Sequence, residues 1–283
     1  MDFEKWHALG NDYLIVERDV LPFELTQARI RALCAAHTGV FADGILLLSR
    51  PDQPGFAARL RIFNPDGSEA ELSGNGAREA ALYLRRNGWT DADSFSIQTA
   101  AGAIRPTITS ATTARLDLGQ VRVRSGDYPS GADDGVGELS AAGRHWRFQH
   151  VQVGNPQCVI RVADQPELEA LTLPEIGPGI ERHELFPHRT NVSWYTPLGT
   201  GRIRARIFER GVGETAASGT GATGAAVAHV LDGGHSPVTV VLDGGELEVE
   251  VGEDLQVNLS GWAVPVFRGT LADDFVKELN ETQ

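Results

Sequence analysis

The sequence predicts a mixed α/β protein, of the α+β type, built from two similar halves. The first observation is a repeat, because residues 61–81 and 206–226 both read Arg-Ile-Phe, then a carboxylate, then Ser-Gly-x-Gly-Ala. The second is that an alternating, strand-like stretch precedes a helix-like run of small residues in both copies. The third is length, since 283 residues can form two domains of about 140 residues each. We therefore expect one strand–turn–helix unit to occur twice.

The repeat continues upstream of this unit. A Gly-Asn pair at residues 10–11 precedes Ser73 at nearly the distance at which the pair at residues 154–155 precedes Ser218. Residues 5–19 are expected to form two strands joined by this Gly-Asn turn.

Residues 45–49 predict a buried strand, and residues 58–64 a strand with one covered face. Between these strands and the first pair, residues 25–39 predict a helix that Thr26 caps and Gly39 stops. Its buried face is expected to carry Ile30, Leu33, Cys34 and His37.

The second copy of the helix begins at Ser218 and ends at the glycines after residue 232. Residues 124–144 are rich in Gly, Ser and Asp, which indicates a linker or surface excursion between the halves. Residues 238–259 predict a meander with a Gly-Gly hairpin turn at 244–245.

The two helix starts are the candidate binding elements. Ser73 begins a helix that Gly88 ends, and Gly74, Asn75 and Gly76 leave backbone N–H groups open to a ligand. Such donors carry a partial positive charge, which suits a carboxylate or phosphate. Serine is also a preferred helix cap, so each serine has a purely structural interpretation. Two copies with the same glycines favour a ligand shared by the two helix ends.

Composition excludes several classes of protein. The net charge is -13 and the isoelectric point about 5.0, with scattered acids, which disfavours nucleic acid and anionic membrane as partners. Cys34 and Cys158 have no CxxC spacing, so neither a disulfide framework nor a zinc knuckle is expected. The first residues do not resemble a secretory signal, and no apolar run approaches a membrane span. We expect a soluble cytoplasmic protein.

Five motifs together resemble the motif set of the diaminopimelate epimerase family. They are HALGND (7–12), RIFNPDGSEAELSGNGAR (61–78), GNP (154–156), FPHRTNV (186–192) and ERGVGETAASGTGA (209–222). The resemblance implies two pseudo-symmetric lobes, each a curved, mostly antiparallel sheet around a central helix, with the substrate in the cleft. It implies a first lobe of residues 1–121 plus 264–283, to which the last strand near 264–269 returns, and a second lobe of residues 122–263.

The resemblance also implies an activity. The family epimerises LL-diaminopimelate to the meso form, for lysine and peptidoglycan biosynthesis, with no cofactor and no metal, and as a homodimer. Two cysteines at helix N-termini exchange the α-proton, one removing it and the other returning it on the opposite face. Backbone N–H groups of both helices bind the α-carboxylate and stabilise the charge that develops there.

Site residues follow from the same motifs. Ser73 and Ser218 occupy the two catalytic positions, and Glu209 is the polar neighbour of the second. The group expected to hold the α-amino-acid end is Gly74, Asn75, Gly219 and Thr220. The group expected to bind the amino group and the distal end is Asn11, Asn64, Asn155, Asn191, Glu209 and Arg210.

The chain departs from its family at three positions. Both cysteines are serine, and the histidine that neighbours the first cysteine is Gln157. A hydroxyl titrates far above a thiol, and glutamine cannot act as its base. A laboratory exchange of the cysteines would not normally change Gln157 too, so this residue favours natural divergence. Cys158 should point away from Gln157 in a strand, which argues against a relocated thiol.

Three functions remain open. The chain is an epimerase by descent with weak or altered activity, or another cofactor-free isomerase or dehydratase of the superfamily, or a non-catalytic amino-acid-binding protein. In the second case Glu209 or Glu214 is the candidate base, although each has a structural interpretation as an ion-pair or turn residue.

Overall fold

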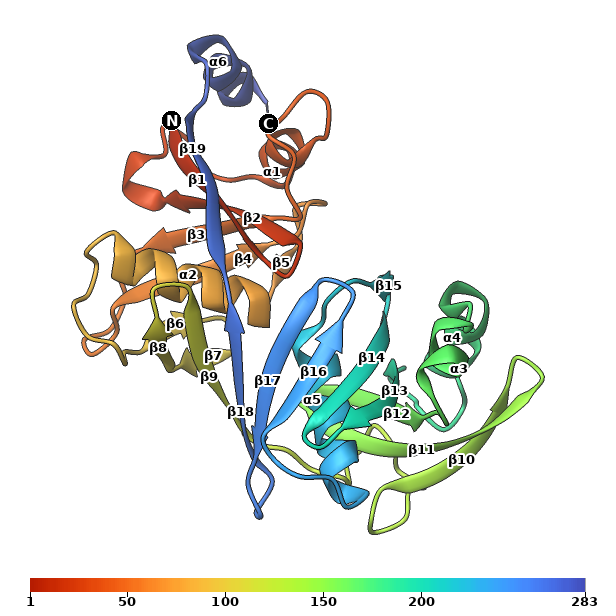
Figure 1. Ribbon diagram of the computed structural model, residues 1–283. Helices are drawn as coiled ribbons and strands as arrows, with labels where there is room; N and C mark the ends of the chain where they lie inside the picture. The colour runs from red at the N-terminus through yellow and green to blue at the C-terminus, as the bar shows by residue number, and fades with distance from the viewer. Residues whose placement is uncertain (283) are drawn as a thin grey trace. The chain divides into compact units, whose positions relative to one another are not determined.

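A computed structural model describes residues 1–282 and divides the chain into two compact units. Unit 1 comprises residues 1–116 and 261–283, and unit 2 comprises residues 117–260. The chain leaves unit 1 within strand β9 (Thr113–Gln120) and returns within strand β18 (Gln256–Trp262). Each unit is rich in β-structure and has its own core, as predicted for the fold class (Figure 1).

The sheet of unit 1 has the strand order β19-β1-β2-β3-β4-β6-β7, with β5 paired to β4. β2 is parallel to β3 and β4 to β6, and the other pairs are antiparallel. The expected return of the last strand is confirmed, because β19 pairs with β1. The strands of unit 1 are β1 (Asp2–Ala8), β2 (Asn11–Glu17), β3 (Ile45–Ser49), β4 (Ala58–Phe63), β5 (Glu69–Ala70), β6 (Ile97–Thr99), β7 (Gly102–Ile104), β8 (Pro106–Ser110) and β19 (Val264–Thr270).

Unit 2 repeats this strand order as β10-β11-β12-β13-β14-β16-β17, with β15 paired to β14 and β18 following β17. The parallel pairs recur at equivalent places, β12 with β13 and β14 with β16. The sequence repeat covers only one strand and one helix of each unit, whereas the structural repeat covers the whole strand order. The strands are β10 (Val136–Ala141), β11 (Arg144–Val153), β12 (Asn155–Arg161), β13 (Asn191–Gly199), β14 (Arg202–Glu209), β15 (Gly213–Thr215), β16 (Val238–Leu242) and β17 (Gly245–Val251).

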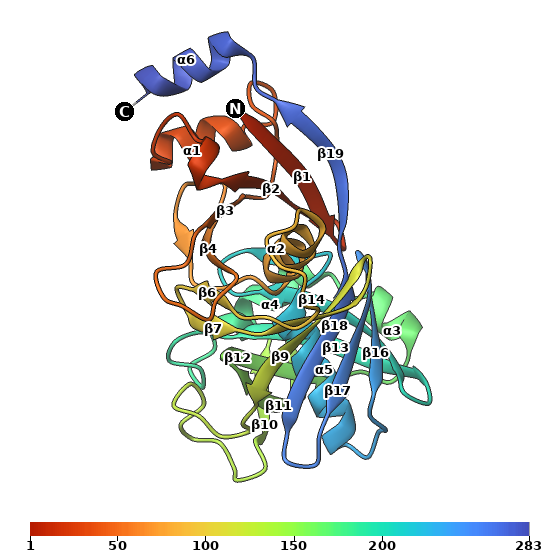
Figure 2. The same ribbon diagram turned by 90° about the vertical axis from the view of Figure 1, so that its left-hand side faces the viewer.

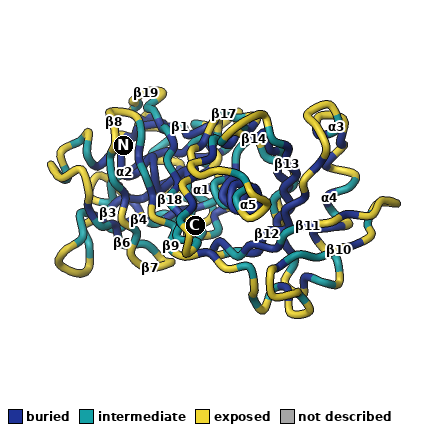
Figure 3. Tube along the Cα trace, turned by 60° about the horizontal axis from the view of Figure 1, so that its bottom comes forward, coloured by how far each residue is buried: buried dark blue, intermediate teal, exposed yellow. Residues whose placement is uncertain are grey.

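A central helix lies against each sheet. In unit 1, α2 (Gly74–Arg86) contacts β1, β2, β3, β4 and β8, and the two ribbon views show the strands curving past it (Figures 1 and 2). In unit 2, α5 (Gly219–Leu231) contacts strands from β11 to β17. Both helices are buried on every side over most of their length, and α5 stands out as a dark tube in Figure 3. In α5 most of the enclosed side chains are small, whereas α2 also buries two charged side chains, Arg78 and Glu79.

The second glycine of each Ser-Gly-x-Gly motif lies close to the sheet. A Cβ atom at Gly76 would lie 2.9 Å from the end of the Leu46 side chain of β3, and one at Gly221 would lie 2.7 Å from Ile207 of β14. A side chain at either position would therefore force its neighbour on the sheet to move, and Ile207, with two branches close to Gly221, has less freedom to do so than the end of Leu46.

The remaining helices are shorter than α2 and α5, and two of them belong to each unit. They are α1 (Gln27–Cys34), α3 (Gln165–Glu169), α4 (Leu173–Glu181) and α6 (Asp273–Glu281), with a 3-10 turn at Arg18–Val20. Thr26 caps α1 as predicted, accepting a hydrogen bond from Arg29 N at 3.3 Å. The predicted length was wrong, because α1 ends at Cys34 and His37 is exposed. Val40 N instead bonds Leu33 O, so the chain turns back over the helix end.

Two further predictions need correction. Residues 124–144 are not a linker between the halves, because they lie inside unit 2 and include β10, paired with β11. The hairpin turn is Asp243-Gly244 rather than 244–245, since Leu242 and Gly245 already face each other in the ladder. Helices α3 and α6 were not predicted, because both are short and depend on packing against other elements.

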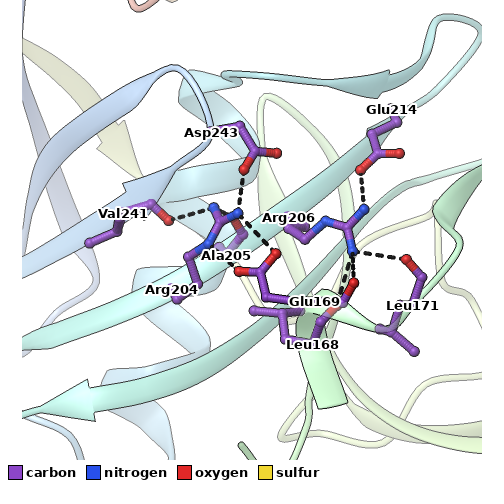
Figure 4. Close-up of polar contacts among 9 residues, drawn as sticks. All are labelled: Leu168, Glu169, Leu171, Arg204, Ala205, Arg206, Glu214, Val241 and Asp243. Carbon is purple, nitrogen blue, oxygen red and sulfur yellow. Dashed lines mark hydrogen bonds and ion pairs between the residues drawn. The ribbon is translucent and has the colours of Figure 1, made fainter. Parts of the chain in front are cut away.

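Two arginines of β14 hold α3 in place (Figure 4). Arg206 Nη1 donates to Leu168 O at 3.0 Å and to Leu171 O at 2.8 Å, which takes up carbonyl groups at the helix end. Its Nη2 donates to Glu214 at 2.6 Å. Arg204 binds Glu169 at 2.8 Å and also Asp243.

No helix within residues 1–282 is long and apolar enough to cross a membrane.

Candidate functional site

The first centre is Ser73, at the start of α2. Its backbone is extended, and its Oγ accepts a hydrogen bond from Gly76 N at 3.1 Å, so it caps the helix. The Tyr13 hydroxyl donates a second hydrogen bond to Ser73 Oγ at 3.2 Å. Helix geometry leaves the N–H groups of Gly74 and Asn75 without an intrahelical acceptor. The predicted helix start therefore has its donors, and a hydroxyl stands beside them.

Asparagines of unit 1 gather at this helix start. Asn75 Nδ2 donates to Asn11 Oδ1 at 3.2 Å, which joins α2 to the turn between β1 and β2. Asn64 is half-buried at the end of β4, and its Nδ2 donates to Ser68 Oγ at 2.9 Å. The structure thus joins Asn11 directly to Asn75, whereas Asn64 bonds within its own turn.

The second centre is Ser218, at the start of α5. Its Oγ accepts a hydrogen bond from Gly221 N at 3.3 Å and donates one to Glu209 Oε2 at 3.0 Å. Thr215 donates to the other carboxylate oxygen at 2.8 Å. Burial raises the pKa of Glu209, and the hydrogen bonds from Thr215 and Ser218 oppose that shift. The site therefore holds a half-buried carboxylate in contact with the serine hydroxyl.

The other predicted residues of unit 2 form two pairs. Asn155 Nδ2 donates to Thr220 Oγ1 at 3.3 Å, which repeats the contact between Asn11 and Asn75. Asn191 Oδ1 accepts from Arg210 N at 2.7 Å, while the exposed Arg210 side chain donates to His188 O at 2.9 Å. Asn191 is almost fully buried, and its Nδ2 has no hydrogen-bond partner among the described residues.

Gln157 forms a side-chain hydrogen bond with Asn155, two residues before it on β12. Its side chain is fully buried, and its Nε2 donates to Asn155 Oδ1 at 2.6 Å. It packs against α5, since a Cβ atom at Gly224 would lie 3.1 Å from it. Cys158 next to it lies in the separate apolar cluster with Trp146 and Ile180. The prediction that Cys158 points away from Gln157 is confirmed.

Three contacts of the site were missed by sequence reasoning. They are the hydrogen bonds from Tyr13 to Ser73, from Thr215 to Glu209 and from Arg78 to Asn75. Arg78 had a local signal, because it follows Asn75 by three residues on a helix and such pairs meet. The other two had none.

The remaining carboxylates of the repeat are structural. Glu214 binds Arg206 at 2.6 Å, and the equivalent Glu69 binds Arg61 at 2.7 Å. Both therefore stabilise the turn after the Arg-Ile-Phe strand, which favours the structural interpretation of Glu214 over a role as base.

Known structures establish the class of fold. A phenazine biosynthesis protein of Bacillus anthracis is similar with a TM-score of 0.66 and 17% identity, over 96% of this chain and 99% of that chain. A hydroxyproline epimerase of Agrobacterium vitis is similar with a TM-score of 0.65 and 15% identity, over 97% of this chain and 93% of that chain. At these identities the likeness concerns the fold alone.

Sequence comparison establishes the family. The family model described as diaminopimelate epimerase matches residues 3–124 and 149–263. The diaminopimelate epimerase of Synechococcus sp. (strain JA-3-3Ab) is 40% identical over 282 residues, which cover 96% of this chain and 99% of the relative. That of Desulforudis audaxviator is 42% identical over 281 residues, covering 95% and 98%. The chain belongs to the diaminopimelate epimerase family.

Proposed function

We propose that the protein is a cofactor-independent amino-acid epimerase that interconverts LL- and meso-diaminopimelate. The observation that carries this proposal is the half-buried Glu209 carboxylate, which accepts the Ser218 hydroxyl hydrogen at the N-terminus of α5. Relatives of about equal length that carry this activity in their names support it. The proposed binding residues are Asn11, Asn64, Gly74, Asn75, Asn155, Asn191, Glu209, Arg210, Gly219 and Thr220.

The Ser218–Glu209 pair suits proton abstraction. As the Cα–H bond breaks, its proton passes to Ser218 Oγ while the hydroxyl proton passes to Glu209, so charge and protons balance. The electron pair left on the α-carbon spreads into the α-carboxylate, where N–H groups of a helix start stabilise it. A raised carboxylate pKa makes Glu209 a stronger base than an exposed glutamate.

Ser73 suits the return of a proton. Its oxygen accepts hydrogen bonds from Tyr13 and from Gly76 N, so its own hydroxyl hydrogen is left to donate. As that proton passes to the α-carbon, the Tyr13 hydroxyl proton passes to Ser73 Oγ, and a proton from water then restores Tyr13. Serine is a much weaker acid than cysteine, so we expect turnover far below that of a thiol enzyme.

Exchange of the α-proton in deuterated water tests the proposal. Proton NMR of LL-diaminopimelate with the wild-type protein should show slow loss of the α-proton signal and growth of the meso form. The double variant Ser73→Cys/Ser218→Cys should speed exchange by a factor on the order of 100, because thiols act as acid and base near neutral pH. As a control, Glu209→Gln should abolish the wild-type rate.

Other outcomes would reject the proposal. Saturable binding without exchange in the wild type and in the double cysteine variant indicates a binding protein. Neither binding nor exchange indicates another isomerase or dehydratase, with a different substrate.

We further propose that the protein is a homodimer in the cytoplasm, with its two halves related by pseudo-symmetry. The repeated strand order supports the last point. Two unpaired, buried cysteines are typical of a reducing compartment. Strand β19 ends the sheet of unit 1 and exposes Val266 and Phe267, which is a surface suited to pairing between copies.

A further inference from the structure

A continuous chain of side-chain hydrogen bonds runs behind the helix start of unit 1. Arg78 Nη2 donates to Asn75 Oδ1 at 2.5 Å, and Asn75 Nδ2 donates to Asn11 Oδ1 at 3.2 Å. Asn11 Nδ2 then donates to Asp43 Oδ2 at 2.9 Å. We call these four residues the amide relay. It joins α2, the turn between β1 and β2, and the loop before β3.

The two ends of the amide relay set its direction. A guanidinium group only donates hydrogen bonds, and a carboxylate only accepts them. Asn75 must therefore turn its oxygen to Arg78, and Asn11 must turn its nitrogen to Asp43. The bond between the two amides follows from this, since Asn75 then has nitrogen and Asn11 has oxygen to offer. Neither amide can rotate by 180° without breaking a charge-assisted bond.

Both ends are held by further contacts. Arg78 is fully buried, and its Nη1 also donates to Gly74 O at 3.1 Å. Burial lowers the pKa of Arg78 to about 10, which leaves it charged at neutral pH. Asp43 Oδ2 also accepts from Asp12 N at 3.0 Å, and Asp43 N donates back to Asp12 Oδ1 at 2.9 Å. Lys5 binds Asp12 at 2.8 Å and so anchors this end.

Unit 2 has an equivalent chain without charged ends. Gln157 donates to Asn155, and Asn155 donates to Thr220, at 2.6 and 3.3 Å. An amide and a hydroxyl can each donate or accept, so this chain can run in either direction. The position of Arg78 is taken by Thr223, whose hydroxyl donates to Gly219 O at 2.8 Å and to no side chain of the described residues. The fixed direction is therefore particular to unit 1.

We propose that Arg78 and Asp43 are positioning residues that hold Asn75 and Asn11 with an N–H group of each available to a carboxylate of the ligand. Each amide has its oxygen engaged and a second N–H hydrogen that no contact within residues 1–282 takes up. The backbone N–H groups of Gly74 and Asn75 add donors at the same helix start. The two amides and this helix start then present donors alone, which selects an anionic group. The identity of the ligand in this inference rests on the proposed function. The direction of the amide relay does not depend on it.

Side-chain amide spectra test the relay without a ligand. The ¹H–¹⁵N signals of the Asn11 and Asn75 side chains are compared in wild type, Asp43→Asn, Arg78→Gln and a control, Arg85→Gln. Asp43→Asn should shift the Asn75 signal as well as that of Asn11, although Asp43 touches only Asn11 of the two. Arg85 lies on the same helix in an exposed pair with Asp93, so its variant should shift neither. A shift of Asn11 alone in Asp43→Asn would overturn the relay.

Binding tests the choice of ligand. Dissociation constants are measured for LL-diaminopimelate and for L-lysine, which lacks the distal carboxylate and keeps the α-carboxylate. Asp43→Asn and Arg78→Gln should weaken diaminopimelate binding roughly tenfold, the effect of one hydrogen bond to a charged group. A smaller loss for lysine assigns the two amides to the distal carboxylate, and an equal loss assigns them to the α-carboxylate. No loss for either ligand would overturn the assignment to a carboxylate.

The failure of the proposed function has a different signature. If wild-type protein binds neither ligand, the proposed substrate is wrong and the carboxylate assignment falls with it, while the spectra still decide the relay. Because Arg78 is buried, its variant can fail to fold, which circular dichroism reveals. Asp43 is exposed, so Asp43→Asn then carries the test.

Discussion

At the scale of single residues, Ser73 and Ser218 occupy the same place in the repeat and have opposite hydrogen-bond roles. Ser218 donates to Glu209, whereas Ser73 accepts from Tyr13. Glu209 is replaced by Asn64 at the equivalent position of unit 1, and Asn64 bonds Ser68 instead. The repeated framework therefore carries two hydroxyl groups with different polar neighbours, a carboxylate beside Ser218 and a phenol beside Ser73.

His150 predicts a pH dependence of stability. It is buried on β11 with its Nε2 2.9 Å from Ser125 Oγ, and burial lowers its pKa from 6.5 to about 4. The unfolded chain takes up this proton near pH 6.5 and the folded chain only near pH 4. The stabilisation is therefore present above pH 6.5 and is lost as the pH falls toward 4. Between pH 7.5 and 5 the loss should be roughly 2 kcal/mol.

Urea unfolding at several pH values, for wild type and His150→Gln, measures this loss. The variant should lose less stability than wild type over the same pH range, whatever its absolute stability. Parallel curves for the two proteins would assign the pH dependence to other groups.

At the scale of elements, the two Arg-Ile-Phe strands use the same ion pair for different purposes. Arg61 binds Glu69 in unit 1 at a half-exposed site, and its guanidinium also lies over the Phe63 ring. Arg206 binds Glu214 and in addition the carbonyl end of α3, with only 13% of its side chain exposed. The same ion pair thus stabilises the same turn in both units, and in unit 2 the arginine also bonds the end of α3.

Lysine substitutions should separate these purposes. Arg206→Lys should cost about 2 kcal/mol of unfolding free energy, because lysine cannot bond the carbonyl groups and Glu214 in one planar arrangement. The matched change Arg61→Lys should cost less than about 1 kcal/mol, as is usual for exposed ion pairs. Chemical denaturation measures both. Equal costs would mean that the contacts of Arg206 with α3 contribute nothing.

At the scale of the whole molecule, each unit has a separate apolar core and a free edge to its sheet. The core of unit 1 includes Leu279 of α6, so the C-terminal segment completes the first unit. Exposed Val266 and Phe267 lie on the edge strand β19, where unpaired backbone groups favour association.

The proposed homodimer predicts a mass of twice 30.5 kDa. Sedimentation equilibrium of wild-type protein should give this value, and Val266→Lys should shift it toward the monomer, because a charge at the strand edge opposes pairing. The control Leu198→Lys places the same charge on an exposed apolar residue of β13 and should leave the mass unchanged. A monomeric wild type would contradict the proposed homodimer. A dimeric Val266→Lys variant would show that the dimer interface does not include the edge of β19.

Local chemistry explains which predictions were confirmed. Thr26 as a cap, the strand at residues 45–49 and the helix beginning after Ser73 depend on neighbours within a few residues. Predictions failed where a distant contact decides the outcome. Helix α1 stops at Cys34 although Ala35 and Ala36 favour a helix, because the following residues fold back onto its end. The hairpin turn was displaced by one residue, because strand register rather than glycine content fixes it.

The sequence by itself determined the repeat, the α/β class, the two serine-capped helix starts and the family. These rest on local periodicity, capping and motif spacing, all of which are properties of adjacent residues. Only the tertiary structure decided that Tyr13 donates a hydrogen bond to Ser73 and that Asp43 accepts one from Asn11. A hydrogen bond extends over about 3 Å, and these partners lie 60 and 32 residues apart in the sequence, so only the folded chain can bring them within reach.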